Sequence, residues 1–131
     1  GRHKVEVLKE NLLKINPDLN LKVKNKIITT ANIKEIFSDC QILVEAFDRA
    51  SSKKVMVKNY LNQSELLISA SGLAGWGNFD EIKTKKIYDN FYMVGDFKTE
   101  ADGDHPPVSP GVNIAAAKQA DIILNYVMEE L

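Results

Sequence analysis

The sequence predicts an α/β fold in which helices flank a mixed or parallel sheet. Helical and strand-like patterns alternate along the 131 residues, which indicates parallel strands joined by helices. Residues 42–47 form an apolar run of the kind found in strands buried on both faces. A second such strand, residues 66–70, is followed by a cluster of glycines. Ligands bind beyond the carboxyl ends of such strands, so Asp48 and these glycines should share one edge of the sheet.

The first part of the chain should contain a helix, a short strand and a second, short helix. Apolar residues spaced three and four apart predict the first helix, namely Val5, Leu8, Leu12 and Ile15. Pro17 ends this helix, because the residue before a proline is pushed out of helical geometry. Residues 21–24 alternate and predict a short strand that continues toward residues 27–28. Asn32 should cap a short helix over residues 33–37.

The second part should contain two helices, two strands and a long loop. Ser51 or Ser52 is expected to cap a helix after the buried strand of residues 41–47. Another strand, residues 91–94, follows that of residues 66–70. Prolines and glycines prevent regular structure over residues 97–111, where we expect a mobile loop. Helical spacing then predicts a last helix over about residues 111–130.

Composition argues against several classes of function. The formal net charge of −1 argues against charge-driven binding of nucleic acid or membranes, and the lysine-rich residues 22–26 and 83–86 should be solvated. The single cysteine, Cys40, allows neither an internal disulfide nor a cysteine-based zinc site, and we expect it to be buried packing. No apolar stretch reaches the roughly 18–20 residues of a membrane span, and no signal-peptide pattern is found. We therefore expect a cytoplasmic protein.

Acidic residues supply the candidate ligands for a metal ion or a nucleotide. Asp48, at the end of the buried strand, either caps the following helix or holds a metal ion or nucleotide at the sheet edge. Glu45 lies inside the same apolar strand and needs a partner if it is buried, but the pattern does not identify that partner. His105 lies near Asp102 and Asp104, where a polar loop is the favoured interpretation over a metal site.

Glycines surround Trp76 after the strand of residues 66–70. Gly72, Gly75 and Gly77 form either a flexible turn or bare backbone that a ligand or an extended peptide can approach closely. The tryptophan favours the second interpretation. The order G-x-x-G-x-G differs from the dinucleotide motif G-x-G-x-x-G, and no acidic residue is placed for a ribose. An oxidoreductase that binds a nicotinamide cofactor is therefore disfavoured.

A series of short motifs resembles the short branch of the ThiF family, the sulfur-carrier adenylyltransferases of thiamine biosynthesis in the ubiquitin-activating-type superfamily. The motifs occur in the family's order and cover nearly the whole chain: Gly1-Arg-His-Lys4, Ile15-Asn-Pro17, Glu45-Ala-Phe-Asp48, Lys53, Ala70-Ser-Gly-Leu-Ala-Gly-Trp-Gly77, Asn90-Phe-Tyr92, Gly95-Asp96, Pro110-Gly-Val112 and Ala115-Ala-Ala-Lys-Gln-Ala120. The resemblance implies a Rossmann-like α/β sheet flanked by helices, which we expect to be incomplete at its N-terminus.

The resemblance also implies a reaction. Family members bind ATP with Mg²⁺ and the Gly-Gly tail of a small ubiquitin-like sulfur carrier protein. The tail carboxylate attacks the α-phosphate to give an acyl-adenylate, which then accepts sulfur. By position, Asp48 corresponds to the catalytic aspartate that holds Mg²⁺ with ATP, and Lys4 and Lys53 correspond to basic residues at the nucleotide.

The partner site is implied in the same way. A groove for the carrier tail would be bordered by Ser71, Gly72, Gly75, Trp76 and Gly77. The loop of residues 97–111 corresponds to the segment that covers the tail in relatives.

Departures from the family pattern shape the remaining expectations. An N-terminal strand, a glycine-rich turn and arginines of the family's nucleotide site have no counterpart before Lys4. Arg49 and Gly111 replace a common asparagine and arginine, and neither a loop cysteine nor the Cys-x-x-Cys zinc site is present. We expect residues 1–131 to be the C-terminal part of one adenylyltransferase domain, inactive alone and homodimeric when complete. The alternative is a non-catalytic module that binds the carrier.

Overall fold

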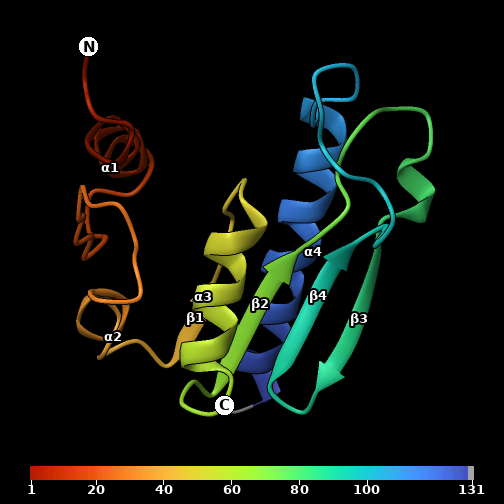
Figure 1. Cartoon of the computed structure of the whole chain (residues 1–131). Helices are drawn as coiled ribbons and strands as arrows, with labels where there is room; N and C mark the ends of the chain where they lie inside the picture. Colours follow the sequence, from red (N-terminus) through yellow and green to blue (C-terminus); the bar gives the residue numbers. More distant parts are fainter. Residues whose placement is uncertain (130–131) are drawn as a thin grey trace.

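The computed structural model describes residues 1–129, and a four-stranded sheet lies at its centre (Figure 1). The strands are β1 (Ile42–Val44), β2 (Leu66–Ala70), β3 (Lys83–Tyr88) and β4 (Phe91–Gly95). They lie in the order β1-β2-β4-β3. β1, β2 and β4 are parallel, whereas β3 pairs with β4 in the antiparallel direction. The predicted α/β fold, with a mixed or parallel sheet flanked by helices, is confirmed, and the sheet is mixed.

Two helices cover the two faces of the sheet (Figure 1). Helix α3 (Ala50–Tyr60) connects β1 to β2 and packs on one face, and α4 (Ser109–Glu129) packs on the other. Pro110 lies in the first turn of α4, where its missing N–H costs no hydrogen bond. The short 3-10 helix η1 (Phe79–Glu81) lies between β2 and β3. The last helix was predicted to reach residue 130, which lies outside the described residues.

The first two helices lie beside the sheet rather than on it (Figure 1). Helix α2 (Ile33–Ile36) contacts α3, whereas α1 (Lys4–Ile15) buries none of its residues. Leu8 and Ile15 are 57% and 81% exposed, so the apolar face of α1 is left open to solvent. No helix within residues 1–129 is long and apolar enough to cross a membrane.

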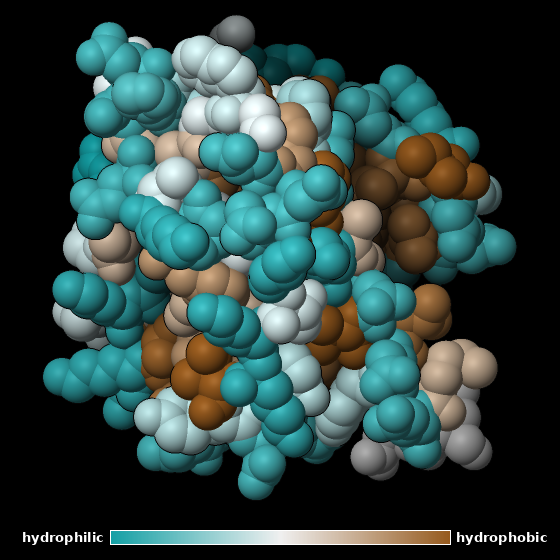
Figure 2. All heavy atoms as spheres, turned by 90° about the vertical axis from the view of Figure 1, so that its right-hand side faces the viewer, coloured by the Kyte–Doolittle hydropathy of each residue, from teal (hydrophilic) through white to brown (hydrophobic). Residues whose placement is uncertain are grey.

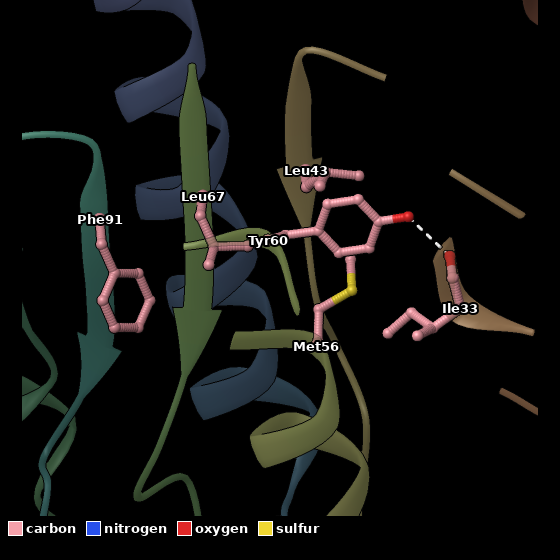
Figure 3. Packing of buried hydrophobic residues seen from close by; sticks show 6 residues of the cluster. All are labelled: Ile33, Leu43, Met56, Tyr60, Leu67 and Phe91. Atoms are coloured by element: carbon pink, nitrogen blue, oxygen red, sulfur yellow. Dashed lines mark hydrogen bonds between the residues drawn. The ribbon is translucent and has the colours of Figure 1, made fainter. Parts of the chain in front are cut away.

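The main core lies between the sheet, α3 and α2 (Figure 3). Its buried members are Ile33, Leu43, Met56, Tyr60, Leu67 and Phe91. A second cluster joins β4 to α4 through Ile82, Val94 and Ala115. Each face of the sheet therefore has its own buried apolar cluster, as expected for a layered α/β fold.

We expect Tyr60→Phe to lower the free energy of unfolding by about 1–2 kcal/mol. The Tyr60 hydroxyl donates a 2.6 Å hydrogen bond to the carbonyl oxygen of Ile33 and ties α3 to α2 (Figure 3). Its removal leaves a buried carbonyl without that donor. Urea unfolding curves measure the change, with Tyr88→Phe as the control, because Tyr88 is 58% exposed. Equal curves for the two variants would contradict this role for the hydroxyl.

Several predicted details differ from the structure. Residues 21–24 and 27–28 form no strand, because alternation alone supplies no neighbouring strand to bond with. β1 is shorter than the predicted residues 41–47. Arg49 rather than Ser51 or Ser52 occupies the N-cap of α3. Cys40 was predicted to be buried and is exposed, since it precedes β1 in a surface turn.

Strand β3 was not predicted, although its lysines are solvated as expected. All six of its residues are exposed, so no apolar alternation marks it as a strand. The face of the molecule seen from the side of β3 is mostly hydrophilic, with hydrophobic residues in small separate groups (Figure 2). Lysines on an outer strand discourage pairing with another chain, so β3 is a protected edge of the sheet.

Candidate functional site

The residues that follow β1, β2 and β4 meet at one edge of the sheet, the upper edge in Figure 1. β1 and β2 are parallel, with Val44 paired to Ile68, so the segments that follow them emerge side by side. Asp48 follows β1, and residues 71–77, called here the glycine segment, follow β2. Their predicted place on a common edge is confirmed. The beginning of α4 lies at the same edge (Figure 1).

Glu45 directly follows β1, and its side chain is 0% exposed. Lys53, one turn into α3, places its ammonium nitrogen 3.0 and 3.1 Å from the two carboxylate oxygens. The hydroxyl of Ser69 and the N–H of Ala70 donate to Oε1, the latter at 3.1 Å. The N–H of Phe47 donates to Oε2 at 3.1 Å. These donors compensate for burying the charge, and they identify the partner that the sequence pattern left open.

Asp48 is exposed, and it has no hydrogen-bond or ion-pair partner among residues 1–129. The interpretation that Asp48 caps the following helix is not supported, because α3 begins after Arg49 without a side-chain cap. Its carboxylate is open to a ligand. One such carboxylate suits Mg²⁺ bound with a nucleotide, since this ion keeps several waters and combines one or two carboxylates with phosphates. In the described part of the chain, no three His, Cys, Asp or Glu residues gather to hold a metal by themselves.

The predicted basic residues lie in two different places. The ammonium of Lys53 is held at the sheet edge by Glu45, and its side chain is 23% exposed. Lys4 begins α1 and is exposed. Because α1 lies to one side of the sheet (Figure 1), the structure does not bring Lys4 to Asp48 and Lys53.

The glycine segment passes so close to the end of β4 that side chains cannot fit between them. Gly95 has a φ of +152°, and a Cβ there would lie 1.5 Å from the carbonyl oxygen of Ser71. Gly72 has a φ of +76°, and a Cβ there would lie 1.9 Å from Oδ1 of Asp96. These two glycines are required by close packing as well as by backbone geometry.

A pocket of about 460 Å³ opens between the glycine segment and the loop that follows β4. Three of the predicted groove residues line it, Gly72, Gly75 and Trp76, whereas Ser71 and Gly77 do not. The remaining lining combines apolar and polar side chains: Leu73, Ala74, Phe79 and Ile82 with Asn78, Asp96, Thr99, Glu100 and His105. Mixed lining of this kind is typical of sites for peptides and small molecules.

The loop after β4 is tied to the glycine segment by backbone contacts. The N–H of Gly75 donates to the carbonyl oxygen of Pro106 at 3.1 Å. The rings of Trp76 and His105 stack, with their centroids 6.2 Å apart. His105 also lies 3.3 Å from a carboxylate oxygen of Asp102, in a loop that gathers no third metal ligand. His105 thus lies in a polar loop beside the glycine segment.

Asp96 lines this pocket and organises the turn that follows β4. Its burial raises the pKa of the carboxyl, but hydrogen bonds from the N–H groups of Thr99 and Lys98 and from the Thr99 hydroxyl outweigh burial and lower the pKa. The ionised carboxylate therefore stabilises the folded state above the pKa of an unfolded aspartate, about 3.9. This stabilisation is lost as the pH falls through the lowered pKa of the folded state.

We accordingly expect Asp96→Asn to lower the thermal midpoint at neutral pH, and the difference from the parent to shrink below about pH 4. Thermal unfolding from neutral to acidic pH measures it, with Asp80→Asn as the control, because Asp80 is an exposed aspartate of η1. A difference that grows on acidification would contradict the assigned direction.

Sequence reasoning missed several contributors to this site. Ser69 looks like an ordinary strand residue until β2 places it beside Glu45. Thr99, Glu100 and Phe79 become pocket residues only through the folding of their loops. One usable signal was present: a glutamate within an apolar strand, with a lysine eight residues later.

The family of this chain follows from a match with a known protein family. Residues 1–130 match the family described as the ThiF family. The chain belongs to the ThiF family. The resemblance to this family, drawn from the motifs, is thereby confirmed, and it indicates an adenylyltransferase-type enzyme family. The thiamine sulfur carrier stays a prediction.

Solved structures of other proteins share the fold of this ThiF family chain. E. coli tRNA N6-threonylcarbamoyladenosine dehydratase, TcdA, in complex with ATP has a TM-score of 0.77 at 13% identity, covering 100% of this chain and 68% of that one. A structure named TcdA (CsdL) has a TM-score of 0.75 at 15% identity, covering 98% of this chain and 68% of that chain. The E. coli dehydratase with AMP has a TM-score of 0.65 at 18% identity, covering 92% and 67%. No curated protein sequence matches the chain.

Proposed function

We propose that this ThiF family chain takes part in the ATP-dependent adenylylation of a ubiquitin-like sulfur carrier protein, for the thiazole of thiamine. The acceptor is the C-terminal Gly-Gly carboxylate of the carrier. The observation that supports the proposal best is the common edge of the sheet, where Asp48, Lys53 and the pocket of the glycine segment follow neighbouring strands. A nucleotide and a peptide tail need such adjoining places in order to react with each other.

In the proposed site, Asp48 would coordinate the Mg²⁺ that accompanies ATP and neutralises charge on its phosphates. The Lys53 ammonium would approach a phosphate oxygen from α3. Lys4 remains a predicted nucleotide ligand on the strength of its family position, and it requires α1 to approach the nucleotide.

The proposed chemistry asks the protein for positioning and charge neutralisation. A carboxylate oxygen of the tail attacks the α-phosphorus, and a carboxyl oxygen–phosphorus bond forms. The bond from that phosphorus to the pyrophosphate oxygen breaks, which releases pyrophosphate and leaves an acyl-adenylate. The attacking carboxylate is already ionised at neutral pH, so no side chain has to remove a proton.

The pocket of the glycine segment is the proposed place for the tail. Bare backbone at Gly72 and Gly75 lets an extended peptide approach closely, and Trp76 offers an apolar surface beside it. The loop after β4 borders the same pocket through Thr99, and in the proposal it covers the bound tail.

A protein carrier is favoured over RNA as the partner. The solved structures of similar fold include a tRNA-modifying dehydratase, but the formal net charge of this chain is −1. Affinity for RNA rests largely on neutralising phosphates with excess positive charge. We also propose a cytoplasmic homodimer, which would cover apolar residues left exposed on α1 and α4, such as Leu8, Ile15, Leu124 and Met128.

Pyrophosphate exchange into ATP tests the proposed reaction. The polypeptide that contains these residues is incubated with ATP, Mg²⁺, labelled pyrophosphate and the sulfur carrier of the same organism. We expect exchange with the intact carrier and none with a carrier that lacks its last two glycines. Exchange with tRNA in place of the carrier would overturn the choice of partner. Equal exchange with the intact carrier and with the carrier that lacks its last two glycines would overturn the choice of acceptor.

A non-catalytic carrier-binding module is the second candidate function. Arg49 and Gly111 depart from the family pattern, and the Lys53 ammonium is already paired with Glu45. Such a module would bind the carrier with the same affinity in the presence and absence of Mg–ATP. Calorimetric titration of the carrier under both conditions separates the two functions, because the enzyme should bind the tail more tightly with nucleotide present.

A further inference from the structure

We propose that Glu45 is a positioning residue of the nucleotide site, which fixes the Lys53 ammonium with an N–H free for a phosphate oxygen. This inference rests on the proposed function, in which Lys53 contacts ATP. Neither the family motifs nor the composition assigns Glu45 a role.

The geometry of the ion pair carries the inference. The ammonium nitrogen lies 3.0 Å from Oε1 and 3.1 Å from Oε2 of Glu45, whose side chain is fully buried. An ammonium has three N–H donors, so bonds to two oxygens leave one for a ligand. The Lys53 side chain is 23% exposed, which leaves the ammonium an approach from the solvent side.

The carboxylate is itself held from two neighbouring strands, and this makes the lysine position rigid. The N–H of Phe47 holds Oε2 from the end of β1, and Ser69 and the N–H of Ala70 hold Oε1 from β2. A lysine side chain otherwise samples many rotamers, and ordering it costs free energy when a ligand binds. In the proposal, the contact with Glu45 already orders the Lys53 side chain when the protein folds. The ammonium is then preorganised, and nucleotide binding does not have to order it.

A purely structural role for the pair is the competing explanation. Buried ion pairs often contribute little net stability, because desolvation offsets the attraction between the charges. A structural pair would therefore affect unfolding without a specific effect on nucleotide affinity. The two explanations differ in whether Glu45 and Lys53 act as one unit toward Mg–ATP.

A double-mutant cycle on Mg–ATP binding tests the inference. Dissociation constants are measured by calorimetry for the parent polypeptide that contains these residues, Glu45→Gln, Lys53→Met and the double variant. We expect Glu45→Gln and Lys53→Met each to weaken binding about tenfold, the size expected for one charge-assisted hydrogen bond to phosphate. The double variant should bind no more weakly than Lys53→Met, because Glu45 acts only through the lysine.

Two controls separate positioning from folding. Ser64→Ala removes a buried serine hydrogen bond, to the carbonyl oxygen of Tyr60, at the opposite end of β2 from the ion pair. It should leave nucleotide affinity within about twofold of the parent, since no contact of Glu45 or Lys53 is changed. Lys53→Arg keeps a cation and should retain more affinity than Lys53→Met.

If Glu45→Gln fails to fold, Glu45→Asp replaces it, because the shorter side chain draws the carboxylate away from the lysine. If Lys53→Met fails to fold, the double variant is compared with the Glu45 variant alone, and we expect their affinities to agree within about twofold.

Parent-like affinity in a folded Glu45 variant would overturn the inference. So would additive losses in the double variant, since they mean that each residue acts independently. Failure of the parent polypeptide to bind Mg–ATP would instead overturn the proposed function, so the two failures are distinguishable.

Discussion

Replacing Asp48 with asparagine should reduce carrier-dependent pyrophosphate exchange by on the order of 100-fold or more. Asp48 is an exposed carboxylate without a partner among the described residues, at the edge where the chain leaves β1 for α3. Asparagine keeps the shape of the side chain and removes the charge that would hold Mg²⁺ with ATP. The fold should be unaffected, because no described contact depends on this carboxylate.

Asp39→Asn is the matched control for this substitution. Asp39 precedes β1 at the opposite end of the same strand, and its side chain is 72% exposed. Initial exchange rates and thermal unfolding are measured for both variants. We expect parent-like exchange for Asp39→Asn and unchanged unfolding for both. Parent-like exchange by Asp48→Asn would exclude Asp48 from the reaction.

Replacing Gly95 with alanine should lower the free energy of unfolding by more than about 4 kcal/mol, the largest effect expected of any single methyl group in this chain. The added Cβ would lie 1.5 Å from the carbonyl oxygen and 2.5 Å from the carbonyl carbon of Ser71. These are backbone atoms, so no side-chain rotation relieves the overlap. Gly95 also has a φ of +152°, which disfavours any other residue.

Gly103→Ala provides the control, since a Cβ at Gly103 meets nothing within 4 Å. We expect its stability to stay within about 0.5 kcal/mol of the parent, as for ordinary surface substitutions. Urea unfolding of both variants gives the comparison. A Gly95→Ala variant as stable as Gly103→Ala would mean that the glycine segment does not pass β4 as the structure has it.

Elements with strong local patterns were predictable from the sequence. Residues 66–70 were predicted as a strand and form β2 with those bounds, because five consecutive buried positions leave little ambiguity. The spacing of Val5, Leu8, Leu12 and Ile15 predicted α1, and Pro17 marked its end. In β2 the local pattern and the tertiary environment agree, whereas α1 forms on its local pattern and leaves its apolar face open to solvent.

Features that depend on tertiary partners were not predictable. β3 is exposed on both faces, so only its pairing with β4 makes it a strand. Residues 21–24 have the alternation of a strand and lack a neighbour in the described structure. The partner of Glu45 lies on α3, and the pocket needs the loop after β4 to fold back onto residues 71–77. Of the predicted site residues, Asp48, Lys53 and three of the groove residues come to one edge, whereas Lys4 does not.

The intact mass of the sulfur carrier tests the central proposal most directly. The carrier is incubated with the polypeptide and Mg–ATP, with pyrophosphatase added to remove the pyrophosphate product, and is then measured by mass spectrometry. We expect a fraction of the carrier to gain the mass of one adenylyl group, which is AMP less one water, and a carrier without its last two glycines to gain none. A carrier that binds the protein and keeps its original mass in the presence of Mg–ATP would contradict adenylylation.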